Sequence, residues 1–392
     1  MPINAKRSLL LVSIAHFSLE VSNNYLPVIY PVLINTLDLS YTQVGFIALV
    51  AALGGTLAQP IFGYLSDRWN PRRLIVLGIM WTGLVMGFTG FADNYRLLIW
   101  IVGMGALGSA AFHPAGAALA GSGSTHRRGT AVSIFSVGGN IGAALSPLLV
   151  AAGLRAAGLR GTSVVIPVGL LAGVVVFLLL DRGKAPQDVT LTSPDTQAEP
   201  RFRQGAAIAL ALVVAIVMAR SWVQTSFSTY LPEWIHTQGG TFAMGSRSLF
   251  GFSASVGLGS LLGGPLSDRI ARWQVVAISM LLLAFVVWAF PDATGISQIA
   301  LLGAAGVTVG ASFPVGIVMA QEVWPRGAGI ASALAIGVGW MLGGIGPSVT
   351  GILADRFSLA ESLRALALPA LVGVLAAIAF AAVQNRAVRD AG

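Results

Sequence analysis

A few ionisable residues lie inside long apolar stretches of the chain, where a charged group needs a reason to be present. His16 and Glu20 are one helical turn apart, so they share a face of the helix that the surrounding residues predict. A carboxyl group in a low-dielectric cavity can take up and release a proton as its access to water alternates. We therefore predict proton exchange at Glu20, with His16 as its partner. The structural alternative is a hydrogen-bonded pair that fixes this helix against a neighbour.

Arg220 is a lone cation in a second apolar stretch, and Trp222, Gln224 and Tyr230 follow it closely. A guanidinium group binds phosphonate, phosphate or carboxylate through two parallel hydrogen bonds. Together these residues predict a binding site for a small amphipathic anion. A salt bridge from Arg220 to Glu20 is the structural alternative, and both roles are compatible if a proton or the substrate breaks the bridge.

The composition indicates what must surround these residues. Apolar residues make up 55% of the 392 residues and charged residues only 10%, which is more apolar surface than a soluble protein can bury. Charges and turn signals divide the chain into twelve stretches near the ~20 apolar residues that a membrane-spanning helix needs. These stretches are 8–34, 42–66, 74–91, 97–120, 129–154, 163–180, 205–235, 246–267, 275–290, 299–323, 328–354 and 362–383. The sequence therefore predicts an all-α membrane protein.

Repeated residues predict two similar halves of six helices each. Tyr25-Leu26-Pro27 recurs as Tyr230-Leu231-Pro232, and Pro114 and Pro147 recur as Pro314 and Pro347, at offsets between 200 and 205. We expect an N-terminal half at 1–181, a flexible cytoplasmic linker at 182–203, rich in charge and proline, and a C-terminal half at 204–392. Parallel repeats of this kind are typical of secondary transporters, whose substrate site lies between the repeats near mid-membrane.

The positive charges predict the orientation in the membrane. If both termini are cytoplasmic, sixteen of the 23 Lys and Arg residues lie on that side and six on the other, leaving Arg220 in mid-membrane. The net charge of +8 is spread between apolar runs, so it predicts topological anchors among membrane lipids and no nucleic-acid partner.

Two loop motifs and several helix residues resemble a known family. Gly63-x-Leu65-x-Asp67-Arg68 and its repeat Gly264-x-Leu266-x-Asp268-Arg269 resemble the loop motif of the major facilitator superfamily. His16, Phe112-His113-Pro114, the segment 133–140 and Ala320-Gln321-Glu322 are similar to the fosmidomycin-resistance branch. This resemblance implies the major facilitator fold in a bacterial inner membrane. It also implies proton-coupled efflux, or antiport, of small organic anions or drugs.

Further polar residues are candidates for the substrate site and for gates. We predict that His113, Asn140 and Asn24 contact substrate. For His113 the alternative is a hydrogen bond to the carbonyl that Pro114 frees, and for Asn140 it is a link between helices. The predicted gate residues, at the cytoplasmic ends of helices, are Asp67, Arg68, Asp268, Arg269 and Glu322. There Asp67 and Asp268 are expected to meet the N-termini of the eleventh and fifth helices.

Several other classes of protein fit the sequence poorly. With no cysteine, thiol catalysis and thiolate metal sites are excluded, and no phosphate-binding loop or zinc-protease motif is present. We predict no enzyme activity, no cofactor, no metal site and a monomer. Two alternatives stay open: a proton symporter or facilitator that imports a small organic anion, and a membrane sensor without transport.

Overall fold

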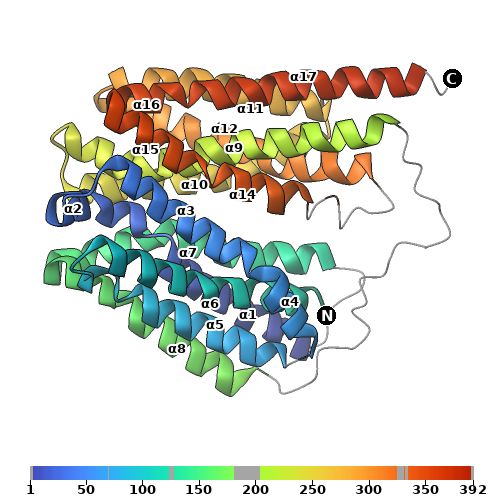
Figure 1. The fold of residues 1–392 in the computed structure, drawn as a ribbon. Helices are drawn as coiled ribbons and strands as arrows, with labels where there is room; N and C mark the ends of the chain where they lie inside the picture. Colours follow the sequence, from blue (N-terminus) through green and yellow to red (C-terminus); the bar gives the residue numbers. More distant parts are fainter. Residues whose placement is uncertain are drawn as a thin grey trace. The chain divides into compact units, whose positions relative to one another are not determined.

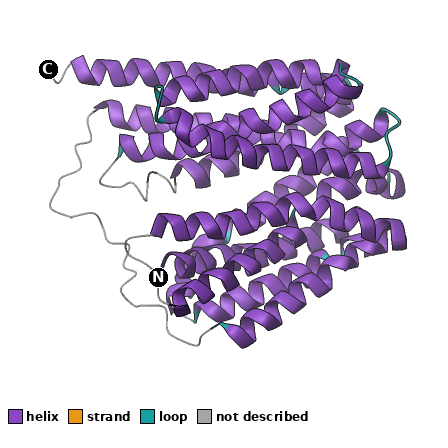
Figure 2. Ribbon diagram, turned by 180° about the vertical axis from the view of Figure 1, so that it is seen from behind, coloured by secondary structure: helices purple, strands orange, loops and turns teal. Residues whose placement is uncertain are grey.

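A computed structural model of the chain describes residues 3–68, 70–122, 128–180, 204–324, 331 and 334–389. Throughout this described part the regular elements are helices, and no strand occurs (Figure 1, Figure 2). The helices before residue 181 are α1 (Ile3–Asn23), α2 (Leu26–Leu37), α3 (Tyr41–Leu57), α4 (Gln59–Arg68), α5 (Pro71–Met86), α6 (Tyr95–Ser122), α7 (Arg128–Ala157) and α8 (Val165–Leu179). The later helices are α9 (Gln204–Thr237), α10 (Phe242–Ser267), α11 (Arg272–Ala289), α12 (Gly295–Val323), α14 (Gly339–Gly343), α15 (Gly346–Arg356), α16 (Leu359–Ala365) and α17 (Ala367–Arg389). The predicted all-α class is confirmed.

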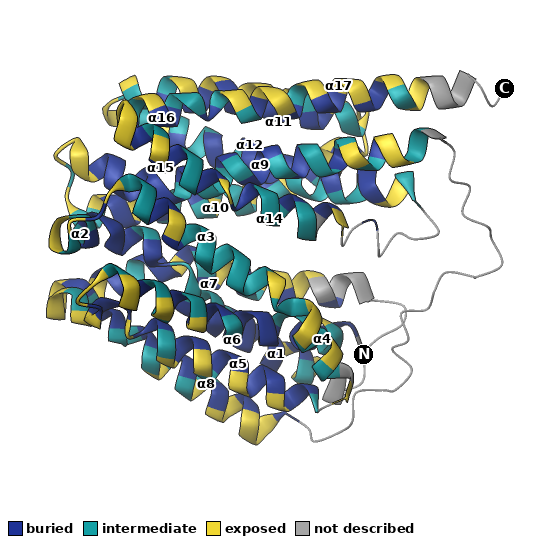
Figure 3. Ribbon diagram, in the orientation of Figure 1, coloured by how far each residue is buried: buried dark blue, intermediate teal, exposed yellow. Residues whose placement is uncertain are grey.

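Nine stretches of the described residues are long and apolar enough to cross a membrane. One of them, Ser133–Leu179, contains both α7 and α8. The predicted first and eleventh spans consist of shorter helices, α1 with α2 and α14 with α15. Large apolar side chains such as Trp100, Leu178 and Leu261 are exposed on these helices, as a lipid environment requires (Figure 3). The described helices are thus consistent with the predicted twelve spans.

Proline explains why three predicted spans are interrupted. Pro27, Pro60 and Pro347 each stand second in the helix that follows a break, in α2, α4 and α15 respectively. A proline has no backbone N–H, so a preceding carbonyl loses its helical partner, whereas in the first turn this costs nothing. Pro232, the repeat counterpart of Pro27, instead lies inside the continuous helix α9. The same motif therefore ends a helix in one half and not in the other.

The chain divides into two compact units. Unit 1 contains residues 1–39, 47–191 and 235–250, and unit 2 contains residues 40–46, 192–234 and 251–392. The predicted linker, 182–203, lies outside the described residues, and the predicted domain boundaries stay a prediction.

Helix α1 is the centre of unit 1. It packs against α5, α6, α7 and α8. Its residues Val12, Ala15 and Leu19 are buried in a core that includes Ile79 of α5 and Phe112 of α6. The polar residues of α1 are therefore held in place by the apolar packing on either side of them.

The first residues of α3 belong to unit 2 because they bond to α15. Both carboxylate oxygens of Asp355 accept 2.8 Å hydrogen bonds, from the backbone N–H groups of Tyr41 and Thr42. A helix start leaves such N–H groups unpaired, and its dipole favours an anion there. The hydroxyl of Tyr230 lies 2.8 Å from the carbonyl oxygens of Tyr41 and Pro347. Tyr230, a predicted substrate residue, thus contacts backbone carbonyls at this junction.

Gly142 of α7 allows a first test of the packing around α1. A Cβ atom at this position would lie 2.2 Å from the carbonyl oxygen of Phe17. We expect Gly142→Ala to lower the thermal midpoint in detergent by several degrees, because forcing packed helices apart costs about 1–3 kcal/mol. Gly55→Ala in α3 is the control, since its Cβ would meet no atom within 4 Å. Equal midpoints for Gly142→Ala and the wild type would contradict this account.

Candidate functional site

Two glycines of α7 create the space that His16 occupies. A Cβ on Gly138 would lie 2.5 Å from the carbonyl oxygen of Ser13, and a Cβ on Gly139 would lie 2.3 Å from Cε1 of His16. The imidazole ring therefore fills the volume that a side chain at position 139 would take. These glycines therefore let α1 and α7 approach each other closely.

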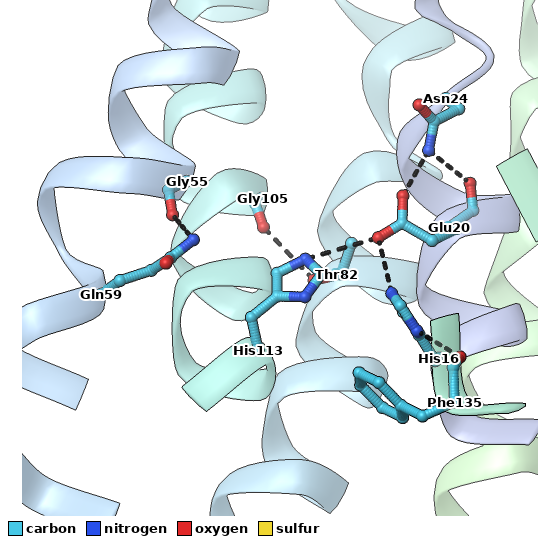
Figure 4. A network of polar contacts seen from close by, with 9 residues as sticks. All are labelled: His16, Glu20, Asn24, Gly55, Gln59, Thr82, Gly105, His113 and Phe135. Atoms are coloured by element: carbon cyan, nitrogen blue, oxygen red, sulfur yellow. Dashed lines mark hydrogen bonds and ion pairs between the residues drawn. The ribbon is translucent and has the colours of Figure 1, made fainter. Parts of the chain in front are cut away.

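Phe135, one turn before Gly139 on α7, fixes the orientation of the His16 ring. The two rings are stacked, with centroids 4.2 Å apart and planes 20° apart. Nδ1 of His16 lies 2.9 Å from the carbonyl oxygen of Phe135, and because a carbonyl only accepts, Nδ1 carries the hydrogen. Nε2 then points to Glu20 with a free lone pair when the ring is neutral (Figure 4). Neither Phe135 nor Gly139 was predicted to contribute, although both stand in the segment 133–140 that carries the family resemblance.

Glu20 lies between two imidazole rings and an amide. Nε2 of His16 and Nε2 of His113 are each 3.4 Å from its Oε1 atom. Nδ2 of Asn24 donates a 2.5 Å hydrogen bond to its Oε2 atom (Figure 4). Helix α1 supplies His16 and Glu20 one turn apart, Asn24 follows directly after its last residue, and α6 supplies His113. The predicted shared face of His16 and Glu20 is confirmed, and His113 joins them from a distant part of the sequence.

This cluster, His16–Glu20–His113, can hold a proton and pass it on. Either imidazole can exchange a proton with the carboxylate oxygen that lies between them. The side chains of His16 and Glu20 are 11% and 16% exposed, while that of His113 is 30% exposed. His113 is therefore the most accessible member, and His16 and Glu20 are both better shielded.

In unit 2, Arg220 of α9 is buried, with 2% of its surface exposed. Its Nε atom donates a 2.9 Å hydrogen bond to the carbonyl oxygen of Val309 in α12. The guanidinium carbon lies 4.6 Å from the ring centre of Phe313 and 5.8 Å from that of Trp340. Among the described residues, Nη1 of Arg220 has no hydrogen-bond partner. A buried N–H donor of this kind is available to an acceptor such as the oxygen of an anion.

Other polar atoms near Arg220 are also unsatisfied within the described residues. Oε1 of Gln224, one turn further along α9, and Nε1 of Trp340 are buried without a partner. Trp222 has a different environment, since a Cβ on Gly346 of α15 would lie 2.7 Å from its ring. We define the cradle as Arg220, Gln224, Phe313 and Trp340. It combines hydrogen-bonding groups with aromatic walls.

Comparison with known proteins identifies the family. The sequence profile described as Major Facilitator Superfamily matches residues 12–253, more than half of the chain. The chain belongs to the Major Facilitator Superfamily. It is 28% identical over 372 residues to the fosmidomycin resistance protein of Escherichia coli (strain K12), covering 93% of this chain and 90% of that protein. It is 29% identical over 380 residues to the MFS-type transporter YfnC of Bacillus subtilis (strain 168), covering 94% and 91%.

Solved structures share the superfamily fold. A bacterial homologue of the human lysosomal transporter Spinster aligns with a TM-score of 0.81 and 17% identity over 96% of each chain. A D-xylose–proton symporter aligns with a TM-score of 0.77 and 16% identity over 96% of this chain and 97% of that one. At these identities the likeness shows the fold alone. The protein is therefore a multi-pass membrane transporter of this superfamily, which acts on a small molecule.

The repeated halves of the chain relate two residues of the cradle to two residues of unit 1. Phe313 and Trp340 stand at the offset of 200 from His113 and Asn140, the same offset that relates the repeated helix prolines. Neither aromatic residue was predicted, although the repeat would have found both as counterparts of predicted residues. Asn140 itself is exposed in unit 1.

The first loop motif is described only in part. The guanidinium carbon of Arg68 lies 4.4 Å from the ring centre of Tyr64. The side chain of Asp67 and the start of the predicted eleventh helix, residues 328–330, lie outside the described residues. The predicted gate contact of Asp67 therefore stays a prediction.

The remaining predicted gate residues lie in unit 2. Asp268 and Arg269 are exposed just after the end of α10. Oε1 of Glu322, in the last turn of α12, lies 2.7 Å from Nη1 of Arg272, the first residue of α11. This ion pair joins two helices of the same unit, and its part in gating stays a prediction.

The packing of the His16 ring against Gly139 and its contact with the Phe135 carbonyl predict the tautomer of His16. In ¹⁵N spectra of the histidine side chains, we expect neutral His16 to carry its hydrogen on Nδ1, because the Phe135 carbonyl accepts from that atom. Gly139→Ala should remove this preference, since the new Cβ would overlap the ring. Gly55→Ala should leave the spectrum unchanged. A mixture of tautomers at His16 in the wild type would contradict the assigned geometry.

Proposed function

We propose that this transporter exports a small organic anion or drug in exchange for protons. It works as an antiporter by alternating access and has no enzymatic activity. The similarity to a fosmidomycin resistance protein supports drug export. We further propose that it acts as a monomer in a bacterial inner membrane with both termini cytoplasmic, which the excess of Lys and Arg on that side supports.

The single observation that carries the substrate class is the buried Nη1 donor of Arg220, which has no hydrogen-bond partner among the residues that the structure describes. A guanidinium group that is removed from water without an acceptor loses hydration energy. An anionic ligand supplies the acceptor and neutralises the charge in the same step. Because Phe313 and Trp340 contact the guanidinium group, their rings also offer apolar contacts to the remainder of the ligand.

The His16–Glu20–His113 cluster supports proton coupling. A carboxylate held against two imidazoles can exist with or without an added proton, and the added proton changes the charge of a largely shielded site. We propose that this change of charge favours one conformation of the transport cycle over the other. Predicted substrate contacts of His113, Asn24, Asn140, Trp222, Gln224 and Tyr230 belong to the same proposal.

Glu20→Gln tests the coupling. In proteoliposomes we expect this variant to lose transport driven by an imposed pH gradient, because the amide cannot take up the coupling proton, while substrate exchange without a gradient persists. Glu361→Gln, which alters an exposed carboxylate of α16, should behave as the wild type. Full gradient-driven transport by Glu20→Gln would remove Glu20 from the coupling role.

Arg220 variants test the substrate class. We expect Arg220→Ala to weaken anion binding about 10–100-fold, since hydrogen bonds to charged groups contribute about 1.5–3 kcal/mol. Arg220→Lys keeps the charge but loses the two-pronged geometry, so its affinity should be intermediate. Arg364→Ala, which removes an exposed ion pair with Asp292, is the control. Unchanged affinity of Arg220→Ala for phosphonates, phosphates and carboxylates would contradict the cradle.

The same proteoliposomes decide the direction of transport. A panel of phosphonates, carboxylates and cationic drugs is tested with the pH gradient imposed in either sense. Movement of an anion against the proton flow supports the antiporter. Movement with the proton flow identifies an importing symporter, and an inert protein favours a membrane sensor.

A further inference from the structure

The His16–Glu20–His113 cluster has the composition of a metal site. Two imidazole nitrogens and one carboxylate oxygen converge from α1 and α6, and these ligand atoms all lie within 4.8 Å of one another. Two histidines and one carboxylate form a known ligand set for Zn²⁺, with a fourth position open. The sequence pattern indicated no metal site, because His113 is brought to the other two residues only by the packing of α6 on α1.

The distances within the cluster match a coordination sphere better than a set of hydrogen bonds. A charge-assisted N–H···O bond is about 2.7–2.9 Å long. Two ligand atoms that are each ~2.0–2.1 Å from a tetrahedral zinc ion lie about 3.4 Å apart. Both Nε2 atoms are 3.4 Å from Oε1 of Glu20. These two separations are the ones expected between ligand atoms that share a zinc ion, and all three ligand atoms lie within 4.8 Å of one another.

Neighbouring groups orient the ligand atoms as they do in metal sites. A metal-binding histidine usually donates its other ring N–H to a carbonyl or carboxylate. Nδ1 of His16 has this partner in the carbonyl oxygen of Phe135, at 2.9 Å, which leaves the lone pair of Nε2 free. Glu20 is held in a similar way, because Asn24 donates to Oε2 and leaves Oε1 to face the histidines. Both supports lie within unit 1 and require no contribution from unit 2.

We propose that His16, Glu20 and His113 bind one divalent transition-metal ion, with Zn²⁺ as the best fit. The ligands are the two Nε2 atoms and Oε1, and water or a small anion completes the tetrahedron. Imidazole nitrogens favour Zn²⁺ over Mg²⁺ or Ca²⁺, which prefer sites made of oxygen alone. The bound ion links α1 to α6, and it stabilises the folded transporter by mass action. This inference does not depend on the direction of transport, and it concerns the same three residues that we propose for proton coupling.

Titration of the purified, tag-free transporter with ZnCl₂ in detergent tests the proposal. We expect one Zn²⁺ per chain by calorimetry, a rise in the thermal midpoint, and no response to MgCl₂ at the same concentrations. His16→Gln and His113→Gln should each lower zinc affinity at least about 100-fold, because even outer-shell partners contribute about 10–100-fold. His126→Gln and His236→Gln replace the other two of the four histidines and should bind zinc as the wild type does.

A spectroscopic measurement keeps the test decisive if the ligand variants fold poorly. Zinc-edge X-ray absorption of the loaded wild type should show imidazole ligands in a four-coordinate shell. Absence of stoichiometric zinc binding by the wild type would overturn the proposal. The proposal would also be overturned if His113→Gln kept its zinc affinity while His126→Gln or His236→Gln lost it. A coordination shell of the bound zinc without imidazole would overturn it as well.

Discussion

The cost of a charge inside a membrane is the constraint on which both sites depend. Lipid offers no hydrogen bonds, so an ionisable side chain must find its partners among neighbouring helices. Glu20 does so fully, because both of its oxygens have polar contacts within unit 1. Arg220 does so only in part, with one bond to a carbonyl, aromatic contacts and an unpaired donor. Because of this difference, we propose that Glu20 acts together with its partners in unit 1 and that Arg220 binds a ligand.

Small residues make these pairings possible, since polar side chains need close helices. Gly138, Gly139 and Gly142 remove the side chains that would hold α7 away from α1. The resulting approach lets Ser146 of α7 donate a 2.6 Å hydrogen bond to the carbonyl of Val21. The same approach places the imidazole of His16 beside the α7 backbone. Glycine therefore acts in this transporter through packing as much as through flexibility.

The sequence predicts what depends on local spacing and misses what depends on contacts between helices. The helical class follows from apolar length, and the pairing of His16 with Glu20 follows from one helical turn. The approach of His113 could not be predicted, because it depends on how α6 packs against α1. Pro27 and Pro232 show the same limit, since an identical tripeptide follows a helix break in one half and lies inside a continuous helix in the other. Local propensity permits both outcomes, and the surrounding structure selects one.

The two repeats are related by a sequence offset of 200, and they carry different chemistry at the matched positions. His113, which faces Glu20, corresponds to Phe313, which contacts Arg220. Exposed Asn140 corresponds to half-buried Trp340, which also contacts Arg220. An imidazole beside a carboxylate can share a proton or a metal ion, whereas an aromatic ring beside a guanidinium can only stabilise the cation. The two units therefore carry different chemistry, an acid among imidazoles in unit 1 and a guanidinium group among aromatic rings in unit 2. The guanidinium group suits recognition of an anion, and the acid among imidazoles suits the coupling of that recognition to a gradient.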